Sequence, residues 1–375
     1  MCSVLRKILM KLIHGRTYEK LAQNMTDSQI GARCHKSVRN YLFVLNCIMS
    51  DVTSSIKKTP VDLNIMDFKQ MFDAEELPTV LNTLYDAGVK DDLFYLINEA
   101  NKSVTFAVKT PTGMTEQKTI RNKIMQGDVL SPLISSNMVD SYIGKMALVT
   151  GNTYLYKQKV EIPPLMMQDN TLAISTCGIK TIKMNNCITT QTNLMGLQFG
   201  KKKCVKMHVG KKYNTDICSD GKVDIWEDKV IIANDRKYHM HNEFVGSEIV
   251  ENVHEKKYLG DIISCDMKNN KNIKEKTNRA VGISNKISTT LMERPYGKHY
   301  FKAAKIMRES MLIGSMLNNS ESWINLTKLD IEKLEKPDTI TQRNIFGNKG
   351  NPSKAFMCLE LGIIPVHFVI MKKRF

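Results

Sequence analysis

The chain has 375 residues, of which 42% are hydrophobic and 25% are charged, a balance typical of globular proteins with two or three packed units. This composition excludes disordered and fibrous classes. The 54 lysines and arginines outnumber the 38 acidic residues and leave a net charge of +16, which favours a polyanionic partner. Nucleic acid is therefore the leading partner class, and the alternative is a protein that is merely basic.

The cysteines and the apolar runs bound the cellular setting. Nine cysteines occur singly, without a Cys-x-x-Cys pair or a paired histidine spacing. This pattern argues against a zinc module and for reduced thiols in an intracellular compartment, nuclear or cytoplasmic. No apolar run approaches the roughly 18 to 20 residues that a transmembrane helix needs, so we expect no membrane partner.

Residues 1–14 are predicted to form an amphipathic helix, the first helix of a domain, with a mitochondrial presequence as the alternative. The expected apolar face consists of Val4, Leu5, Ile8, Leu9, Leu12 and Ile13, and the expected polar face of Arg6, Lys7 and Lys11. Another helix ends near Met49. Just before that helix begins, a basic cluster of Arg33, Lys36 and Arg39 fits either phosphate contacts or a solvated face.

Residues 61–66 alternate as a short strand that delivers Asp67 at its end, followed by a helix toward Ala87. A carboxylate at the end of a strand is a common metal ligand, which makes Asp67 a candidate. Asp73 is better explained as a helix N-cap, because Glu76 follows three residues later as in a capping box.

A helix over residues 91–101 and strands over 103–110 and 115–120 are expected next. Gly127 then permits a close backbone approach to a ligand, and Ser131 with Pro132 begins a helix that runs to Leu148. A helix N-terminus after a flexible glycine suits a phosphate or a base-paired strand.

Residues 163–175 have the pattern of a tight β-hairpin, with apolar arms around a polar tip that displays Asp169 and Asn170. An acidic tip between buried strands is a natural place to hold a metal ion. A pair of aspartates would be the stronger signal, because Asn170 offers only an amide where Mg²⁺ prefers anionic oxygens.

The order of these parts resembles the reverse transcriptases of non-LTR (LINE-type) retrotransposons. Residues 126–132, Gln-Gly-Asp-Val-Leu-Ser-Pro, resemble that family's Gln-Gly-x-x-Leu-Ser-Pro signature. Residues 67–73 resemble its Asp-x-x-x-Ala-Phe-Asp segment, with Met71 in place of alanine. Residues 167–170, Met-Gln-Asp-Asn, fall where the family has aromatic-Ala-Asp-Asp.

Three weaker motifs keep the same order along the chain. Residues 196–203 resemble Gly-Leu-x-x-Asn-x-x-Lys, residues 258–260 resemble the Tyr-Leu-Gly of the primer grip, and residues 29–31 fit a Gln-x-Gly of the fingers. The resemblance extends over about residues 5 to 290.

The resemblance implies an α+β polymerase right hand, with a palm of antiparallel sheet covered by helices on one face and a helical thumb. It divides the chain into a fingers remnant (1–60), a palm (61–210), the end of the palm with primer grip and thumb (211–295), and a helical C-terminal region (296–375). The expected thumb helix, residues 271–291, is basic and amphipathic, with Lys271, Lys274, Lys276, Arg279 and Lys286 beside its apolar positions.

The family's functional residues carry over to matching positions. Asp67 and Asp169 would be the ligands of Mg²⁺ or Mn²⁺, with Asn170 in the third catalytic position. Phe72 would screen the sugar 2′ position of the incoming deoxynucleotide, and Lys203 would approach its triphosphate. The implied partners are an RNA template and a DNA primer, which would be contacted by Gln126, Gly127, Tyr258 and Gly260.

Departures from the family pattern predict impaired polymerisation. Asn170 lacks the charge of a catalytic carboxylate, and Met167, Gln168, Lys123 and Gly200 also replace the usual residues. Earlier fingers strands, an endonuclease domain and a Cys/His knuckle are not found in this sequence, as in a truncated and degenerate copy. The alternative function is a catalytically inactive nucleic-acid-binding protein derived from a retroelement.

Overall fold

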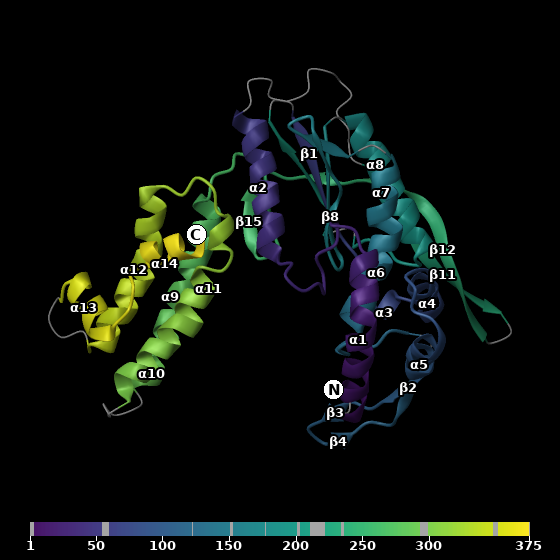
Figure 1. The fold of residues 1–375 in the computed structure, drawn as a ribbon, viewed down its shortest axis with the longest axis horizontal. Coiled ribbons are helices and arrows are strands. Elements are labelled where there is room, and N and C mark those ends of the chain that lie inside the picture. The colour runs from purple at the N-terminus through teal and green to yellow at the C-terminus, as the bar shows by residue number, and fades with distance from the viewer. Residues whose placement is uncertain are drawn as a thin grey trace. The chain divides into compact units, whose positions relative to one another are not determined.

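The computed structural model describes residues 4–54, 60–121, 123–150, 153–176, 178–200, 203–210, 222–233, 236–292, 299–347 and 352–374. The fold is of the mixed α+β class (Figure 1). Its contacts divide the chain into two compact units, the first made of residues 1–37 and 51–253 and the second of residues 38–50 and 254–375. Each unit is described by itself.

The first unit is built on a five-stranded sheet in the order β13-β10-β1-β9-β8. The strands are β1 (Val61–Asp67), β8 (Leu165–Met167), β9 (Asn170–Ser175), β10 (Val205–Val209) and β13 (Glu251–Asn252). All neighbours are antiparallel except β10 and β13. Central β1 is buried along its length up to Asp67, and its alternation of large apolar with small or polar residues is the pattern that predicted it.

Helices cover this sheet and share one apolar core with it. α8 packs against β1 and β9, while α6 packs against both α1 and α4. Core residues such as Met66, Leu84 and Leu133 come from a strand and two helices. The helices are α1 (Val4–Asn24), α3 (Met71–Ala74), α4 (Leu77–Asp86), α5 (Asp91–Lys102), α6 (Ser131–Val139), α7 (Lys145–Thr150) and α8 (Gly178–Leu194), with a π-helical turn, Asp140–Gly144, between α6 and α7.

Two-stranded hairpins complete the first unit. They are β2 (Ser103–Phe106) with β5 (Lys118–Arg121), β3 (Lys109–Thr110) with β4 (Gly113–Met114), β6 (Tyr154–Tyr156) with β7 (Val160–Ile162), and β11 (Lys222–Ala233) with β12 (Arg236–Ile249). The strand predicted over 103–110 is thus confirmed with a break at residues 107–108, whereas the strand predicted over 115–120 begins only at Lys118.

The buried face of α1 differs from the predicted one. Met10, Ile13, Thr17 and Leu21 face the core, whereas Leu5, Ile8 and Leu12 are exposed. Arg6, expected on the solvated face, instead makes a 2.9 Å ion pair with buried Asp128 and donates to the carbonyl of Ala100. The prediction was wrong because the partner of α1 supplies a buried carboxylate, which makes an arginine the better residue on that face.

The predicted N-cap at Asp73 is also wrong. α3 begins after Gln70, whose φ of 50° places it in the left-handed region, and Asp73 lies inside the helix. Glu76 is the N-cap residue of the next helix, α4, without a side-chain cap. The chain turns twice within a few residues here, so the two acids belong to different helices and no capping box forms.

The second unit is mostly helical. Besides residues 38–50 of α2 (Val38–Ser54), it contains the hairpin β14 (Glu255–Tyr258) and β15 (Asp261–Ser264). Its further helices are α9 (Asn270–Met292), α10 (Tyr300–Met307), α11 (Gly314–Met316), α12 (Lys328–Ile345), α13 (Lys354–Leu361) and α14 (Val366–Arg374), with a π-helical turn, Arg308–Ile313, and a 3₁₀ turn, Ser320–Ser322. Thr327 and Asp330 form a complete capping box at the start of α12.

One basic residue of the predicted thumb helix does not lie on its solvated face. Lys276 is buried, makes a 2.9 Å ion pair with Asp261 and donates to the carbonyl of Gly260 at 3.0 Å. Helical periodicity located α9 correctly, but it cannot tell a solvated lysine from one whose acid lies on another element.

The predictions on membrane-spanning segments and on cysteines can be compared with the described part of the chain. None of the described helices alone is long and apolar enough to cross a membrane, and α13 with α14 passes such a test only as a pair bent by 63°. Free cysteines in the described chain are Cys34, Cys47, Cys187, Cys204, Cys265 and Cys358. Cys2, Cys177 and Cys218 lie outside the described residues.

Candidate active site

The end of β1 and the β8–β9 turn lie side by side in the first unit. Asp67, the last residue of β1, is the register partner of Asn170, the first residue of β9. Gln168 and Asp169 form the two-residue turn between β8 and β9, because Met167 pairs with Asn170. Antiparallel pairing therefore brings Asp67, Asp169 and Asn170 to one end of the sheet, although about a hundred positions separate them in sequence.

Lys203 joins this end of the sheet from the segment before β10. Its ammonium lies 2.7 Å from Oδ1 of Asp67. The backbone holds the lysine in place, because the amide of Gly200 donates to the carbonyl of Asp67 at 2.9 Å and the amide of Lys203 donates to the carbonyl of Gly200 at 2.8 Å. Lys203 is 61% exposed, so its charge is presented to solvent as well as to Asp67.

The charged groups at this end influence one another. Burial raises the pKa of Asp169, and the nearby carboxylate of Asp67 raises it further. Lys203 and a 3.0 Å hydrogen bond from Nδ2 of Asn170 oppose that rise. The hydrogen bond to Asp67 raises the pKa of Lys203. Two carboxylates and one ammonium therefore form one electrostatic cluster, which carries a net negative charge when all three are ionised.

The cluster offers an incomplete set of metal ligands. Asp67 and Asp169 supply two anionic oxygen donors, and Asn170 uses its amide nitrogen to hold Asp169. Within the part of the chain that the structure describes, no group of three or more His, Cys, Asp or Glu side chains could hold a metal ion. These donors fit one divalent cation better than two, since paired ions need more anionic ligands.

Three further predicted residues belong to the same unit. Gln126 and Gly127 are exposed in the loop before α6, where Gly127 has a φ of 84°. The ion pair of the next residue, Asp128, with Arg6 fixes this loop. Phe72 is half-buried and packs against the core from α3.

Tyr258 and Gly260, the predicted primer grip, lie in the second unit at the β14–β15 turn. The Tyr258 side chain is buried, and burial raises its pKa. Leu259 and Gly260 have φ values of 47° and 88°, as a tight two-residue hairpin turn requires. Lys276 donates to the carbonyl of Gly260, and Asn319 donates to the carbonyl of Leu259 at 3.1 Å, so the turn is braced from two sides.

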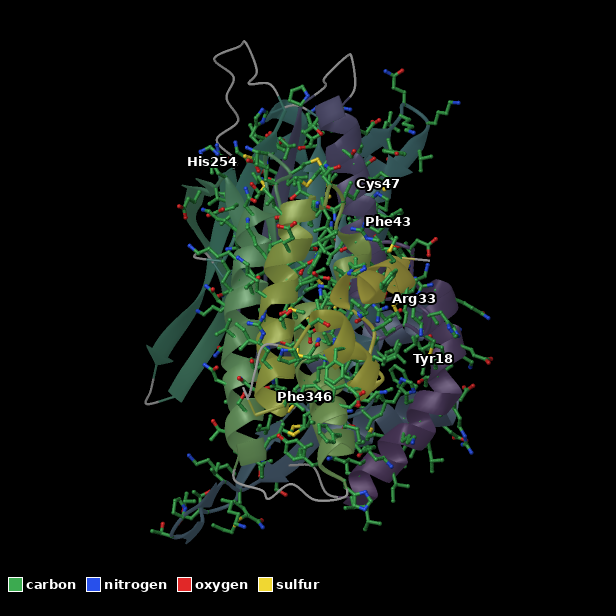
Figure 2. The ribbon with its side chains drawn as sticks, turned by 90° about the vertical axis from the view of Figure 1, so that its left-hand side faces the viewer. Tyr18, Arg33, Phe43, Cys47, His254 and Phe346 are labelled. Carbon is green, nitrogen blue, oxygen red and sulfur yellow. The ribbon has the colours of Figure 1, made fainter. Side chains whose placement is uncertain are left out.

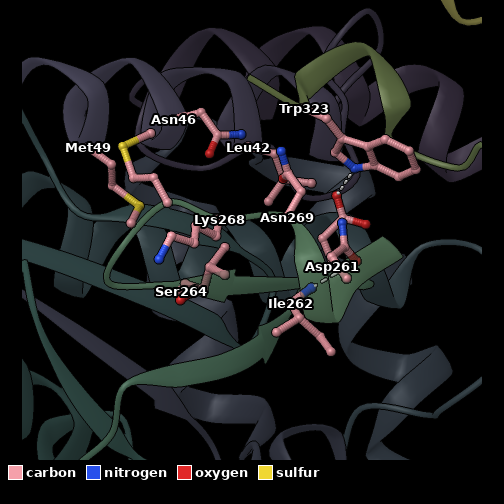
Figure 3. Close-up of a pocket in the computed structure, with 12 residues that line it drawn as sticks. Leu42, Asn46, Met49, Asp261, Ile262, Ser264, Lys268, Asn269 and Trp323 are labelled. Carbon is pink, nitrogen blue, oxygen red and sulfur yellow. Dashed lines mark hydrogen bonds between the residues drawn. The ribbon is translucent and has the colours of Figure 1, made fainter. Parts of the chain in front are cut away.

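A pocket beside this turn is a structural feature of the second unit (Figure 3). Trp323 donates its indole N–H to Oδ2 of Asp261 at 2.8 Å, and Asn272 accepts from the backbone amide of Ile262 at 3.2 Å. Asn46 donates to the carbonyl of Ser322 at 2.7 Å. Because these polar side chains already make hydrogen bonds within the protein, they are less available to a ligand.

Two buried residues near the cluster were not among the predicted site residues. Glu75 is fully buried, accepts a 2.6 Å hydrogen bond from Ser135 and interacts electrostatically with Asp169. Burial raises the pKa of Glu75 to about 8. Gln29, also fully buried, accepts from the amide of Gln168 at 2.9 Å. Its Gln-x-Gly motif was a signal for Gln29, whereas nothing in the sequence distinguishes Glu75 from the adjacent, half-buried Glu76.

No protein-family model matches the sequence, and no curated protein matches it. Solved structures do resemble the fold. Telomerase from Candida albicans in complex with a TWJ fragment of telomeric RNA matches 98% of this chain and 51% of its own, with a TM-score of 0.50 and 12% identity. Apo telomerase from Candida tropicalis matches 97% of this chain and 54% of its own, with a TM-score of 0.48 and 12% identity.

This likeness concerns the fold alone. Telomerase is a polymerase related to reverse transcriptases, so the match to the first of these structures supports a right-hand-like polymerase fold for the chain. The chain spans about half the length of the telomerases it matches.

Proposed function

We propose that this chain is a reverse-transcriptase-like domain of retroelement origin that binds an RNA template with a DNA primer and adds deoxynucleotides slowly. The observation that carries the proposal is the convergence of Asp67, Asp169 and Lys203 at one end of the sheet. The net charge of +16 and the telomerase-like fold support a nucleic-acid partner.

Each residue of the cluster has a role in this proposal. Asp67 and Asp169 would hold one Mg²⁺ or Mn²⁺ ion, which when bound would stabilise the charge that develops on the phosphoryl oxygens. Lys203, exposed and held by Asp67, offers its ammonium to the triphosphate. Half-buried Phe72 is the proposed screen for the sugar 2′ position.

In this proposal, residues outside the cluster position the template and primer strands of the nucleic acid. Gln126 and Gly127, exposed before α6, are proposed to lie against the template and the new base pair. Tyr258 and Gly260 are proposed to support the primer end. Since the Tyr258 side chain is buried, the contact there would come from the backbone of the turn.

Asn170 is the reason to expect slow catalysis. An amide neither neutralises a divalent cation nor binds it as strongly as a carboxylate. Changes in residues that merely orient metal ligands already cost roughly 10- to 100-fold, and the loss of a ligand costs at least as much. The nitrogen of Asn170 also donates to Oδ1 of Asp169, which occupies a lone pair that Asp169 could otherwise offer to the metal ion.

A catalytically inactive nucleic-acid-binding protein is the second candidate. It is favoured by the ion pair of Lys203 with Asp67, which satisfies one of the two carboxylates without a metal ion. In this case the basic surface is kept and the reaction is lost.

Primer extension on an RNA template separates the two candidates. The wild type, Asn170→Asp and Asp169→Asn would be compared with Mg²⁺ and with Mn²⁺. We expect slow extension by the wild type, extension faster by roughly 10- to 100-fold in Asn170→Asp, and none in Asp169→Asn. No incorporation by either of the first two proteins, with duplex binding retained, would support the inactive binding protein instead.

A further inference from the structure

A short segment of the first unit runs along the outer side of the β8–β9 hairpin. We call residues 26–33 the strap. The amide of Met166 donates to the carbonyl of Ser28 at 2.8 Å, and the amide of Ile30 donates to the carbonyl of Met166 at 3.0 Å. The strap thus pairs with β8 as a parallel bridge at Gln29, on the edge that β9 does not use.

Gln29 reaches from the strap to the turn of the hairpin. Its Oε1 accepts from the amide of Gly31 at 2.8 Å and from the amide of Gln168 at 2.9 Å. Gln168 has a φ of 55°, in the left-handed region that is unfavourable for residues other than glycine. Asp169 is the next residue, so the orientation of its carboxylate depends on this strained turn.

Gly31 brings the strap backbone against the same turn. A Cβ atom at Gly31 would lie 2.8 Å from the Gln168 nitrogen and 2.7 Å from Oγ of Ser136. A side chain at this position would therefore displace either the turn or α6. Glycine permits the close approach that lets Gln29 accept both amides.

The strap is itself anchored, so it can act as a fixed support. Asp140 accepts from the amide of Thr26 at 2.7 Å and from its hydroxyl at 2.5 Å. Arg33, labelled in Figure 2, donates to the carbonyl of Thr26 at 2.7 Å and closes the strap on itself. Ser28 donates to the carbonyl of Pro164 at 2.5 Å, at the start of β8.

We propose that Gln29 is a positioning residue that holds the turn at Gln168 and thereby orients Asp169 toward its ligand. The inference rests on the proposed function for the role of Asp169, but the support of the turn is independent of it. The acceptor oxygen is the essential atom, because among the described residues Nε2 of Gln29 makes no hydrogen bond.

Two variants separate the oxygen from the packing. Gln29→Met keeps a long unbranched side chain and removes the oxygen, whereas Gln29→Glu keeps an oxygen in place. Ser28→Ala is the matched control, since it removes a strap hydrogen bond to the hairpin away from its turn. Hydrogen exchange of the Gln168 amide measures how firmly the turn is held. Electron paramagnetic resonance measures the affinity of the Asp67 and Asp169 carboxylates for Mn²⁺.

In Gln29→Met we expect the Gln168 amide to exchange about tenfold faster, because it loses its acceptor. We expect Mn²⁺ affinity to fall roughly 10- to 100-fold in Gln29→Met, with both quantities near wild type in Ser28→Ala and the exchange rate of the Gln168 amide near wild type in Gln29→Glu. Unchanged exchange at Gln168, or equal acceleration throughout β1, β9 and the turn, would overturn the inference. Absence of Mn²⁺ binding by the wild type would count against the proposed function, and the exchange result would then decide the inference alone.

Discussion

Glu75 offers a test of the buried chemistry beneath the cluster. The carboxyl group is fully buried; Ser135 donates a hydrogen bond to it at 2.6 Å, and the charges of Lys123 and Asp169 act on it. Burial is the main cause of a pKa near 8, with Asp169 adding to the rise and with Ser135 and Lys123 opposing it. We expect Glu75→Gln, which has the same shape and no charge, to stabilise the first unit at neutral and alkaline pH.

The magnitude follows from the two pKa values. Between the ordinary value of 4.5 and the folded value of about 8, the native state binds more protons than the unfolded state. The favourable contribution of protonated Glu75 to the free energy of unfolding is therefore fully present below about pH 4.5 and is lost as the pH rises through 8. At about 1.36 kcal/mol for each pH unit, the loss reaches roughly 3 kcal/mol at pH 7 and roughly 5 kcal/mol above pH 8, as an upper bound.

Urea unfolding of the two proteins at pH 4.5, 7 and 8.5 measures this difference. Because the chain has two units, amide exchange in β1 and α6 is the suitable readout for the first of them. Burial also raises the pKa of Asp140, but this group is present in both proteins and its contribution cancels in the comparison.

Glu76→Gln is the control for the substitution itself. Glu76 is half-buried and lies 4.0 Å from Lys123, and we expect its replacement to change stability by less than about 1 kcal/mol at each pH. A stability difference between Glu75→Gln and wild type that does not grow with pH would refute the assignment of a buried, protonated carboxyl.

Three other expectations concern separate parts of the chain. Lys203→Met removes the ammonium 2.7 Å from Asp67, so we expect Mn²⁺ to bind the carboxylates several-fold more tightly by paramagnetic resonance; unchanged affinity would contradict their shared electrostatics. Arg308→Met leaves buried Asp338 without a counter-charge, so we expect a loss of about 3–5 kcal/mol in urea unfolding of the second unit, and a loss below 1 kcal/mol would refute this. Duplex binding, measured by fluorescence anisotropy, should weaken steeply between 50 and 200 mM salt, and salt-independent binding would exclude phosphate contacts.

Local patterns identified the elements that carry the candidate site. The alternation over residues 61–66 is β1, and the two apolar arms around Asp169 are β8 and β9. Such patterns can be recognised in a sequence because side chains alternate between the two faces of a strand, so the periodicity involves only neighbouring residues. The motif resemblance then related Asp67 to Asp169, and strand pairing places them at the same end of the sheet.

Tertiary structure alone decided which charged residues are buried and what they hold. Arg6 and Lys276 were expected on solvated faces, yet each lies against an aspartate from another element of the fold. Glu75 and its half-buried neighbour Glu76 are alike in sequence, and only the fold buries Glu75 fully, where Ser135 donates to it. A charged side chain is stable inside a protein when a partner arrives from elsewhere in the chain, and no periodicity of its own helix records that partner.

The site divides in the same way. The sequence determined that a strand ends in Asp67 and that a hairpin displays Asp169, because both depend on residues close along the chain. Only the folded structure showed that Lys203 pairs with Asp67 and that Gln29 supports the turn before Asp169. Those contacts join segments more than a hundred residues apart. They arise from the pairing of these segments in the folded chain rather than from any local conformational preference.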